Sequence, residues 1–360
     1  MAQEQPVAAF STQPSRTGRR VRRTILIAFL VAVAIVMVLP LTLTTQALDY
    51  NLDPETLGID WLVNKSIVRL ETTIAMFIVL AMAWNLIGGL TGYAAFGNVA
   101  FFGLGAYTVG VMTDASRLHL PFALALVVAP VVPTIFAALI GIPLLRLRGH
   151  YFAIATLGTG IAVGEVIKNI AYLGGATGLF PPILRHADAL FFYLMAAAAA
   201  LSIGVTWLIM RSRFGYGLIA IRENEEAAAV IGVNTTAYKV AAFCVTAALC
   251  GLAGGIFAQW NSFINQENVF PIEYNVQMIL MALIGGAGTL FGPAAGAIML
   301  EWLIQSLAGR SEVAVFAQIG LGVLLAVTVI FLPRGVVDFF GGQSRLSLAY
   351  LRRSLRETSV

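Results

Sequence analysis

The chain has 360 residues, a formal net charge of +4, 59% hydrophobic residues and only 11% charged residues. Ordinary soluble domains are about 45–50% apolar and about 25% charged, so this chain has too few polar groups to cover a folded surface. The composition excludes a soluble, a disordered and a nucleic-acid-binding protein, and it predicts an all-α, polytopic integral membrane protein.

Apolar runs predict where the chain crosses the membrane. A helix that spans the ~30 Å hydrocarbon layer needs about 20 apolar residues. In chain order, runs with few or no charges predict spans at residues 24–48, 72–113 (two crossings), 121–145, 152–173, 189–210, 240–260, 274–307 (two short helices) and 313–333. The sequence therefore predicts about ten transmembrane helices, some of them short or glycine-broken, or about eight or nine if a glycine-broken pair re-enters.

The distribution of basic residues predicts the orientation and the domain boundaries. With the N-terminus inside, 16 of the 22 Lys and Arg residues lie in cytoplasmic segments, as the positive-inside rule requires. We expect a basic cytoplasmic tail at residues 1–23, a transmembrane permease domain at 24–333 and a second basic cytoplasmic tail at 334–360. Both termini are then cytoplasmic, and both tails are expected to contact anionic membrane lipid.

The cytoplasmic loop 211–239 contains a predicted short amphipathic helix. Asn224 can cap the helix, and Glu225 and Glu226 fall in its first turn, where the helix dipole favours anions. Ala227 and Ala228 are small enough for another surface to approach, and Gly232 ends the helix. Composition alone fits a solvated surface helix equally well.

Glycine clusters interrupt two of the apolar runs at corresponding places. Membrane proteins tolerate irregular backbone only where protein or a water cavity satisfies it, so such a pair points to a translocation path. The candidate path residues in these clusters are Gly88, Gly89, Gly92, Gly285, Gly286 and Gly288. Close helix packing of the small-x-x-x-small type explains these glycines as well.

Intramembrane polar residues give further candidates. A charge at mid-bilayer costs roughly 2.5–3.5 kcal/mol on insertion scales, so Glu301, which has no evident local partner, is expected to face the interior of the bundle. Glu165 and Lys168 are spaced to pair with each other. Asn85, Asn98, Thr156 and Thr159 are polar groups able to assist a zwitterionic solute, although ordinary helix–helix hydrogen bonds account for them equally well.

Several sequence blocks resemble one family of transport proteins. Glu226-Ala227-Ala228 with Gly232 resembles the coupling helix of ATP-binding-cassette importer permeases, without the I-x-L-P ending that often follows it. Residues 92–108, 147–158, 213–225 and 285–293 are similar, in order, to conserved blocks of LivM-type branched-chain amino-acid permeases. Two positions depart from that pattern, because Asn98 replaces a histidine and His150 replaces an aspartate.

The resemblance implies a permease subunit of an ATP-driven importer that passes branched-chain amino acids across the bacterial inner membrane by alternating access. The implied partners are two ATP-binding subunits, a periplasmic or surface-tethered substrate-binding protein and a LivH-like second permease. The chain has no G-x-x-x-x-G-K-[ST] loop and no metal-ligand cluster. We therefore expect that it contains no ATPase site and no cofactor, and that it is not an enzyme.

Two alternatives remain at this stage. Members of the same family import urea, short amides or other small organic solutes. A protein of another class, an ion-gradient-driven secondary transporter, would need paired ionisable residues deep in the bundle, and only Glu301 and the pair Glu165–Lys168 qualify.

Overall fold

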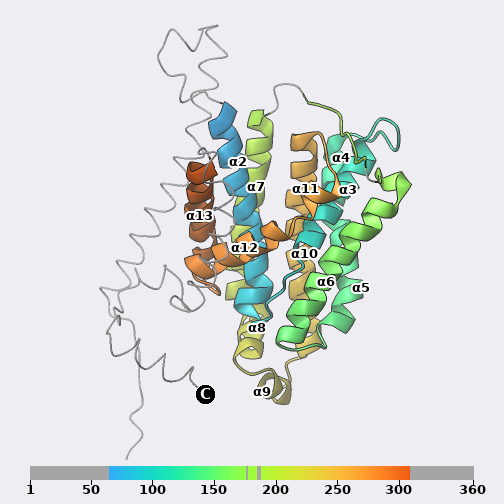
Figure 1. The fold of residues 1–360 in the computed structure, drawn as a ribbon. Coiled ribbons are helices and arrows are strands. Elements are labelled where there is room, and N and C mark those ends of the chain that lie inside the picture. The colour runs from blue at the N-terminus through green and yellow to red at the C-terminus, as the bar shows by residue number, and fades with distance from the viewer. Residues whose placement is uncertain (1–64, 176, 185–187, 309–360) are drawn as a thin grey trace, which may run out of the picture. The chain divides into compact units, whose positions relative to one another are not determined.

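The computed structural model describes residues 65–175, 177–184 and 188–308. All of them belong to one compact unit. Within these residues the regular structure is helical, apart from one isolated antiparallel bridge between Leu179 and Ile264. Figure 1 shows the described helices as a bundle with two shorter helices, α8 and α9, at one end.

The helices follow one another along the chain with short connections. The first half contains α2 (Lys65–Trp84), the π-helical turn η2 (Asn85–Leu90), α3 (Val99–Thr113), α4 (Phe122–Val128), α5 (Val131–Leu144), α6 (His150–Asn169), the 3-10 turn η3 (Ala171–Leu173) and α7 (Asp188–Arg211). The second half contains α8 (Arg213–Glu223), α9 (Glu225–Val230), α10 (Thr235–Asn261), α11 (Gln266–Val269), α12 (Ile272–Gly285) and α13 (Gly292–Ala308).

Each predicted span that lies within the described residues corresponds to a helix or to consecutive helices. Five of these segments are long and apolar enough to cross a membrane: Val68–Leu90, Phe122–Leu144, His150–Asn169, Asp188–Arg211 and Thr235–Asn261. The helices α3, α12 and α13 have 15, 14 and 17 residues, fewer than the roughly 20 that a perpendicular crossing needs. The predicted spans 24–48 and 313–333 lie outside the described residues, so the count of ten stays a prediction.

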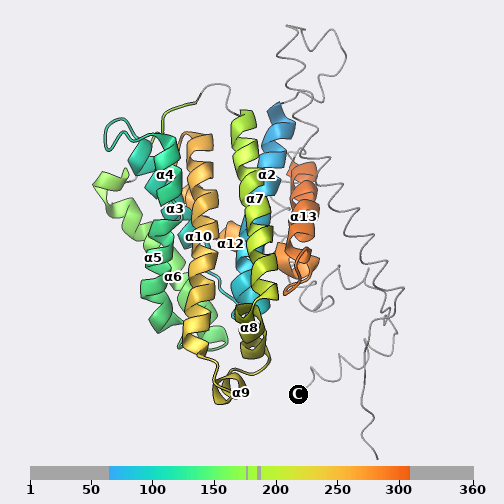
Figure 2. The same ribbon diagram turned by 180° about the vertical axis from the view of Figure 1, so that it is seen from behind.

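The centre of the bundle is the contact between α3 and α10. A Cβ atom added at Gly105 of α3 would lie 2.5 Å from the Cα atom of Gly251, and one added at Gly254 of α10 would lie 2.8 Å from the carbonyl carbon of Phe102. The two backbones therefore touch, which is the small-residue packing typical of membrane helices. Figure 2 shows α10 between α3 and α5 on one side and α7 on the other.

The outer side of α4 and α5 is apolar and exposed. Leu124, Val127, Ile135 and Leu139 are 55%, 69%, 56% and 69% exposed. A folded protein in water rarely leaves such a continuous apolar surface uncovered, whereas lipid chains accept it. This surface supports the assignment of the chain as a membrane protein.

The end of the bundle that carries α8 and α9 also contains the C-terminus of η2 and the N-termini of α6 and α10 (Figure 1). We call it the coupling end. The opposite end contains the loop that follows α3, where Arg117 pairs with Asp114 at 3.8 Å, and the Leu179–Ile264 bridge.

Candidate functional site: the coupling end and the glycine breaks

The short helix predicted in loop 211–239 forms at α9. The Asn224 side chain accepts hydrogen bonds from the backbone N–H groups of Glu226 and Ala227, both at 3.0 Å. At the other end, Gly232 has φ +92° and donates to Ala229 O, and Val233 donates to Ala228 O. These two bonds with a left-handed glycine are a Schellman ending. The hydrogen bonds at Asn224 and after Gly232 thus fix where this short helix begins and ends.

Glu225 ties this helix to the bundle. Its Oε1 accepts a hydrogen bond from Lys239 Nζ of α10 at 2.6 Å, and its Oε2 accepts one from the hydroxyl group of Tyr93. Lys239 also donates to Leu145 O at 2.9 Å, and its side chain is only 4% exposed. Lys239 and Tyr93 both belong to other elements than α9, so the start of α9 is fixed in position.

The charges of this cluster shift the ionisation of its members. Burial by itself raises the pKa of Glu225, but the hydrogen bonds from Lys239 and Tyr93 and the charges of Lys239 and Arg148 outweigh it, so the pKa is lowered overall. Burial and the hydrogen bond to Glu225 raise the pKa of Tyr93. Glu225 is therefore a carboxylate at neutral pH, and Tyr93 is a neutral donor.

The rest of α9 points outward. Glu226 has a side chain that is 77% exposed and bonds only to Arg148, at 2.9 Å, whose side chain is itself 61% exposed. Val230 and Ile231 are 88% and 75% exposed, although both are apolar. Of the three residues Glu226, Ala227 and Ala228, only Ala228 is buried. The two glutamates that are adjacent in sequence thus have different surroundings.

The two glycine breaks contact each other. A Cβ atom added at Gly89 would lie 2.5 Å from the backbone nitrogen of Gly288. Asn85 of η2 bridges the pair, because its Oδ1 accepts from Gly288 N at 2.7 Å and its Nδ2 donates to Thr289 O at 3.0 Å. Segments about 200 positions apart in the chain are therefore joined by backbone contact and by one buried amide.

Each break has its own local structure. The first ends α2 in the π-helical turn η2, and π-helical turns inside helices occur frequently at functional sites. In the second, Gly286 and Gly288 have φ values of +116° and +78°, which favour glycine. Thr289 Oγ1 then accepts from Gly292 N at 3.0 Å, at the start of α13.

Arg222, near the end of α8, joins the coupling end to both breaks. Its Nη1 donates to Gly89 O at 3.0 Å, and a Cβ atom added at Gly288 would lie 2.7 Å from the same nitrogen. Neither Arg222 nor Lys239, two basic residues within loop 211–239, was singled out by the sequence analysis. The local spacing carries no signal for their contacts, because both side chains bind residues that are far away in the chain.

The other predicted path residues lie apart from this site. Asn98 is fully buried at the N-terminus of α3, and neither atom of its side-chain amide has a hydrogen-bond partner among the residues that the structure describes. Glu301 faces the interior, as expected, and is 2% exposed. The expectation that Glu301 has no local partner is wrong, because Gln305, one helical turn later, donates to its Oε1 at 3.0 Å. Its Oε2 has no hydrogen-bond partner within the described part of the chain.

The predicted pair of Glu165 and Lys168 does not form. Both side chains are exposed on α6, and neither takes part in an ion pair within 4.0 Å among the described residues. The spacing alone therefore did not decide whether the two charges meet.

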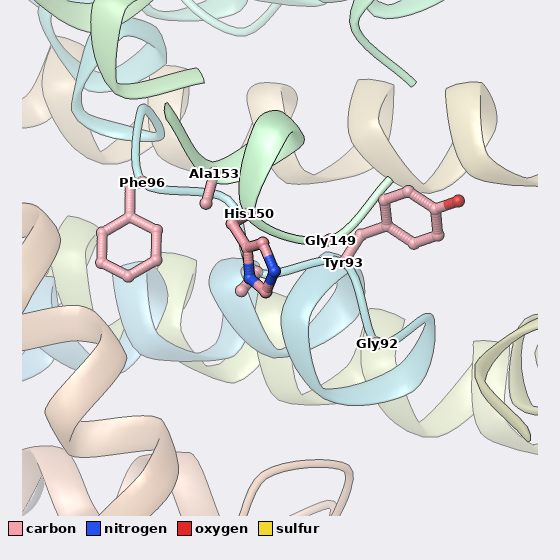
Figure 3. Close-up of a pocket in the computed structure, with 7 residues that line it drawn as sticks. Gly92, Tyr93, Phe96, Gly149, His150 and Ala153 are labelled. Atoms are coloured by element: carbon pink, nitrogen blue, oxygen red, sulfur yellow. The ribbon is translucent and has the colours of Figure 1, made fainter. Parts of the chain in front are cut away.

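A cavity of about 380 Å³ opens between the loop after the first break and the N-terminus of α6. Its lining residues are Gly92, Tyr93, Ala94, Phe96, Gly149, His150 and Ala153. Figure 3 shows the His150 imidazole between Phe96 and Tyr93, whose hydroxyl group points away from it. Thr156 lies behind this loop and accepts from Phe96 N at 3.1 Å. Within the residues that the structure describes, no group of His, Cys, Asp or Glu is arranged to hold a metal ion.

These features define a class of protein. The described residues contain several apolar helices long enough to cross a bilayer and two glycine breaks that touch each other. A fixed helix with an exposed outer surface lies at one end. This organisation fits a multi-pass membrane permease.

The chain belongs to the family described as the branched-chain amino acid transport system / permease component, whose match covers residues 66–332. It is 27% identical to the high-affinity branched-chain amino acid transport system permease protein LivM of Salmonella typhimurium strain LT2, over 79% of this chain and 73% of that protein. It is equally similar, at 27%, to LivM of Escherichia coli strain K12, over 81% of this chain and 75% of that protein.

A shorter similarity reaches another import system. The chain is 28% identical to the autoinducer 2 import system permease protein LsrC of Salmonella paratyphi B, over 55% of this chain and 58% of that protein. No solved structure matches the chain. The protein is thus a LivM-type permease subunit of the ATP-binding-cassette importer class, a family whose members work with separate ATP-binding and substrate-binding components.

Proposed function

We propose that this chain passes branched-chain amino acids across the bacterial inner membrane by alternating access, driven by two ATP-binding subunits. A periplasmic or surface-tethered protein delivers the solute, and a LivH-like permease completes the pathway. The observation that carries the proposal is α9, which is fixed to the bundle through Glu225 and Lys239 and leaves Val230 and Ile231 exposed.

The exposed surface of α9 is the docking site for an ATP-binding subunit in this proposal. Its components are one carboxylate (Glu226), small alanines and two apolar side chains, and the apolar side chains can form the buried core of an interface with another protein. The Glu226–Arg148 pair is exposed on both sides and therefore contributes little to the stability of the chain alone. Glu226 is accordingly free to exchange Arg148 for a residue of the partner.

The second permease is proposed to cover the outer side of α6. This helix exposes Glu165 and Lys168 along with the apolar Ile154 and Ile161. Exposed charges in a membrane span are costly against lipid, whereas the exposed residues of α5 include Val131, Ile135 and Leu139 and no charge. The difference favours a protein partner at α6 and lipid at α5.

The solute is proposed from the relatives, since the LivM proteins are named for branched-chain amino acids. The similarity to LsrC, the departures from the family pattern at Asn98 and His150, and the family members that carry urea or short amides make another small organic solute the second candidate. A gradient-driven secondary transporter has less support, because the predicted Glu165–Lys168 pair is not formed and α9 would then have no role.

The test of the docking proposal is charge reversal at Glu226. Glu226→Lys should abolish ATP-dependent uptake of radiolabelled L-leucine into membrane vesicles and prevent co-purification of the ATP-binding subunits, while the chain still inserts. The matched control is Glu267→Lys, an exposed glutamate on α11 far from the coupling end, which should leave co-purification intact. Unchanged uptake by Glu226→Lys would remove α9 from the mechanism.

The solute is tested by competition in the same vesicles. Unlabelled L-isoleucine and L-valine should suppress leucine uptake, and urea or acetamide should not. ATP-dependent uptake of urea or acetamide in the absence of leucine uptake would replace the proposed solute while leaving the importer class unchanged.

A further inference from the structure

Arg222 occupies the position where the coupling end meets the glycine breaks. It lies in the last turn of α8, one residue before the helix ends and two before Asn224 caps α9. Its side chain leaves the helix toward the bundle and donates from Nη1 to Gly89 O at 3.0 Å. Any displacement of α8 and α9 therefore acts directly on this side chain.

The carbonyl group that Arg222 binds is available because η2 is irregular. In an α-helix, the N–H of Tyr93 would close a turn onto Gly89 O. Here Tyr93 N donates to Ile87 O instead, at 3.1 Å. Gly89 O is thus a carbonyl at the C-terminal end of a long helix, where the partial negative charge of the helix favours a cation. The guanidinium supplies that cation and a hydrogen bond together.

The path of the side chain depends on glycine in both breaks. A Cβ atom added at Gly92 would lie 2.9 Å from Arg222 Cγ, and one added at Gly288 would lie 2.7 Å from Nη1. The stem passes Gly92, and the guanidinium lies between Gly89 and Gly288. Because Asn85 joins Gly288 to η2, Arg222 contacts a unit that contains both breaks.

The ordinary alternative, a surface ion pair, does not account for this arrangement. The carboxylate near Arg222 is Glu223, the next residue, whose side chain is 72% exposed and accepts from Nη2 at 3.1 Å. An ion pair with such an exposed neighbour contributes little to stability. It also does not explain why Nη1 of Arg222 donates to the backbone carbonyl group of Gly89. The glycine breaks supply the more specific interaction.

We infer that Arg222 is the positioning residue through which movement of the α8–α9 segment reaches the two glycine breaks. The inference rests on the proposed function, and it adds a mechanical connection distinct from the Glu225–Lys239 tether. That tether fixes α9 to α10 and to the end of α5, whereas Arg222 connects α8 to the backbone of η2 and of the α12–α13 turn.

The test uses the complete assembly with its ATP-binding subunits and a reporter that does not depend on the solute. Ala94 is exposed and lines the cavity directly after the first break, so a cysteine there reports movement of this loop. Cys244 and Cys250 are replaced by alanine first. The measurement is the labelling rate of Ala94→Cys by a maleimide, with and without ATP and vanadate.

With Arg222 present, nucleotide should change the labelling rate at least about fivefold, the lower end of common coupling factors. In Arg222→Met, which keeps the stem and removes the donors, the change should fall below about twofold while basal ATP hydrolysis persists. Arg222→Lys should restore part of the response, because it keeps the charge and one donor. Arg213→Met, an exposed arginine on the same helix, is the matched control and should respond normally.

A second variant makes the test independent of the folding of Arg222→Met. Gly288→Ala keeps Arg222 and places a methyl group against Nη1, so it should uncouple the loop in the same way. A full nucleotide response in both variants would overturn the inference. Failure of the unaltered chain to bind ATP-binding subunits would instead overturn the proposed function, so the two failures are distinguishable.

Discussion

Gly285, in the second glycine break, and Gly232, at the end of α9, are both glycines that end a helix segment, yet their surroundings differ. A Cβ atom added at Gly285 would overlap the carbonyl group of Gly292 and lie 3.0 Å from Gly296 N. At Gly232 nothing lies within 4 Å of such an atom, and the requirement is only φ +92°. One glycine serves packing, and the other serves the backbone turn.

The contrast separates a region that is closely packed by its own chain, around Gly285, from a region with open space, around Gly232. At Gly89, Gly285 and Gly288 the space beside the glycine is filled by groups of the same chain. The end of α9 has open space around its glycine and exposed Val230 and Ile231 beside it. A permease has these two needs, an internal element that holds its shape and a surface that receives a partner.

The largest effect is expected at the packing glycine. Gly285→Ala forces α12 and α13 apart at their closest point, because both clashing groups belong to the backbone and cannot rotate away. Overpacking typically costs about 1–3 kcal/mol and occasionally more, and we expect the upper end of that range. The midpoint of thermal unfolding in detergent should fall markedly, and uptake should be lost.

Gly204→Ala is the matched control for this change. Gly204 lies inside α7 with nothing within 4 Å of an added Cβ atom, so alanine there should be neutral or slightly stabilising. Equal unfolding midpoints for Gly285→Ala and Gly204→Ala would mean that the α12–α13 contact is looser than described. Gly285 would then not differ from Gly232 in how closely it is packed.

An intermediate effect is expected where the coupling end is tied to the bundle. Lys239→Met removes the donor from Glu225, from Tyr93 and from Leu145 O, and leaves a mostly buried carboxylate with fewer partners. Hydrogen bonds to charged groups contribute about 1.5–3 kcal/mol, and we expect a loss of that size. The unfolding midpoint should drop, and α9 should become more susceptible to proteolysis.

The double variant Lys239→Met with Glu225→Gln shows whether the unpaired charge of Glu225 causes the loss of stability in Lys239→Met. It removes the unpaired carboxylate, so part of the lost stability should return.

The pH dependence of stability also tests whether the charge of Glu225 is the cause. Since the folded-state pKa of Glu225 is lowered, the tether stabilises the protein above the unfolded carboxyl pKa of about 4.3 and is lost as pH falls through the folded value. A double variant with undiminished acid sensitivity would assign that sensitivity to other carboxyl groups.

Much of the helical order was predictable from the sequence, because charge-free runs such as 189–210 and 240–260 are long compared with anything that a soluble fold would use. Asn224, Gly232 and the helix between them followed from capping rules that act over a few residues. The position of both glycine breaks also followed from local composition. These features depend on neighbours in the chain.

The contacts that make a site were not predictable in the same way. Gly89 and Gly288 touch, and Lys239 meets Glu225 and Tyr93, because the whole bundle folds, and no local pattern encodes which distant residue faces which. The positive-inside count treats Lys239 only as a loop charge and carries no information on its burial. Likewise, the i,i+3 spacing of Glu165 and Lys168 predicted an ion pair, but both residues are exposed on α6 and do not pair with each other.

The smallest effect is expected at Gly232. A side chain there meets no atoms, so the cost is that of a left-handed backbone conformation, about 1–2 kcal/mol for alanine. Asparagine visits this conformation more readily, so Gly232→Asn should cost less than Gly232→Ala, whereas a steric requirement would rank them by size. The comparison is the unfolding midpoint of the two variants in detergent. Should asparagine prove more harmful than alanine, unseen packing would surround Gly232, and the end of α9 would be covered already without a partner protein.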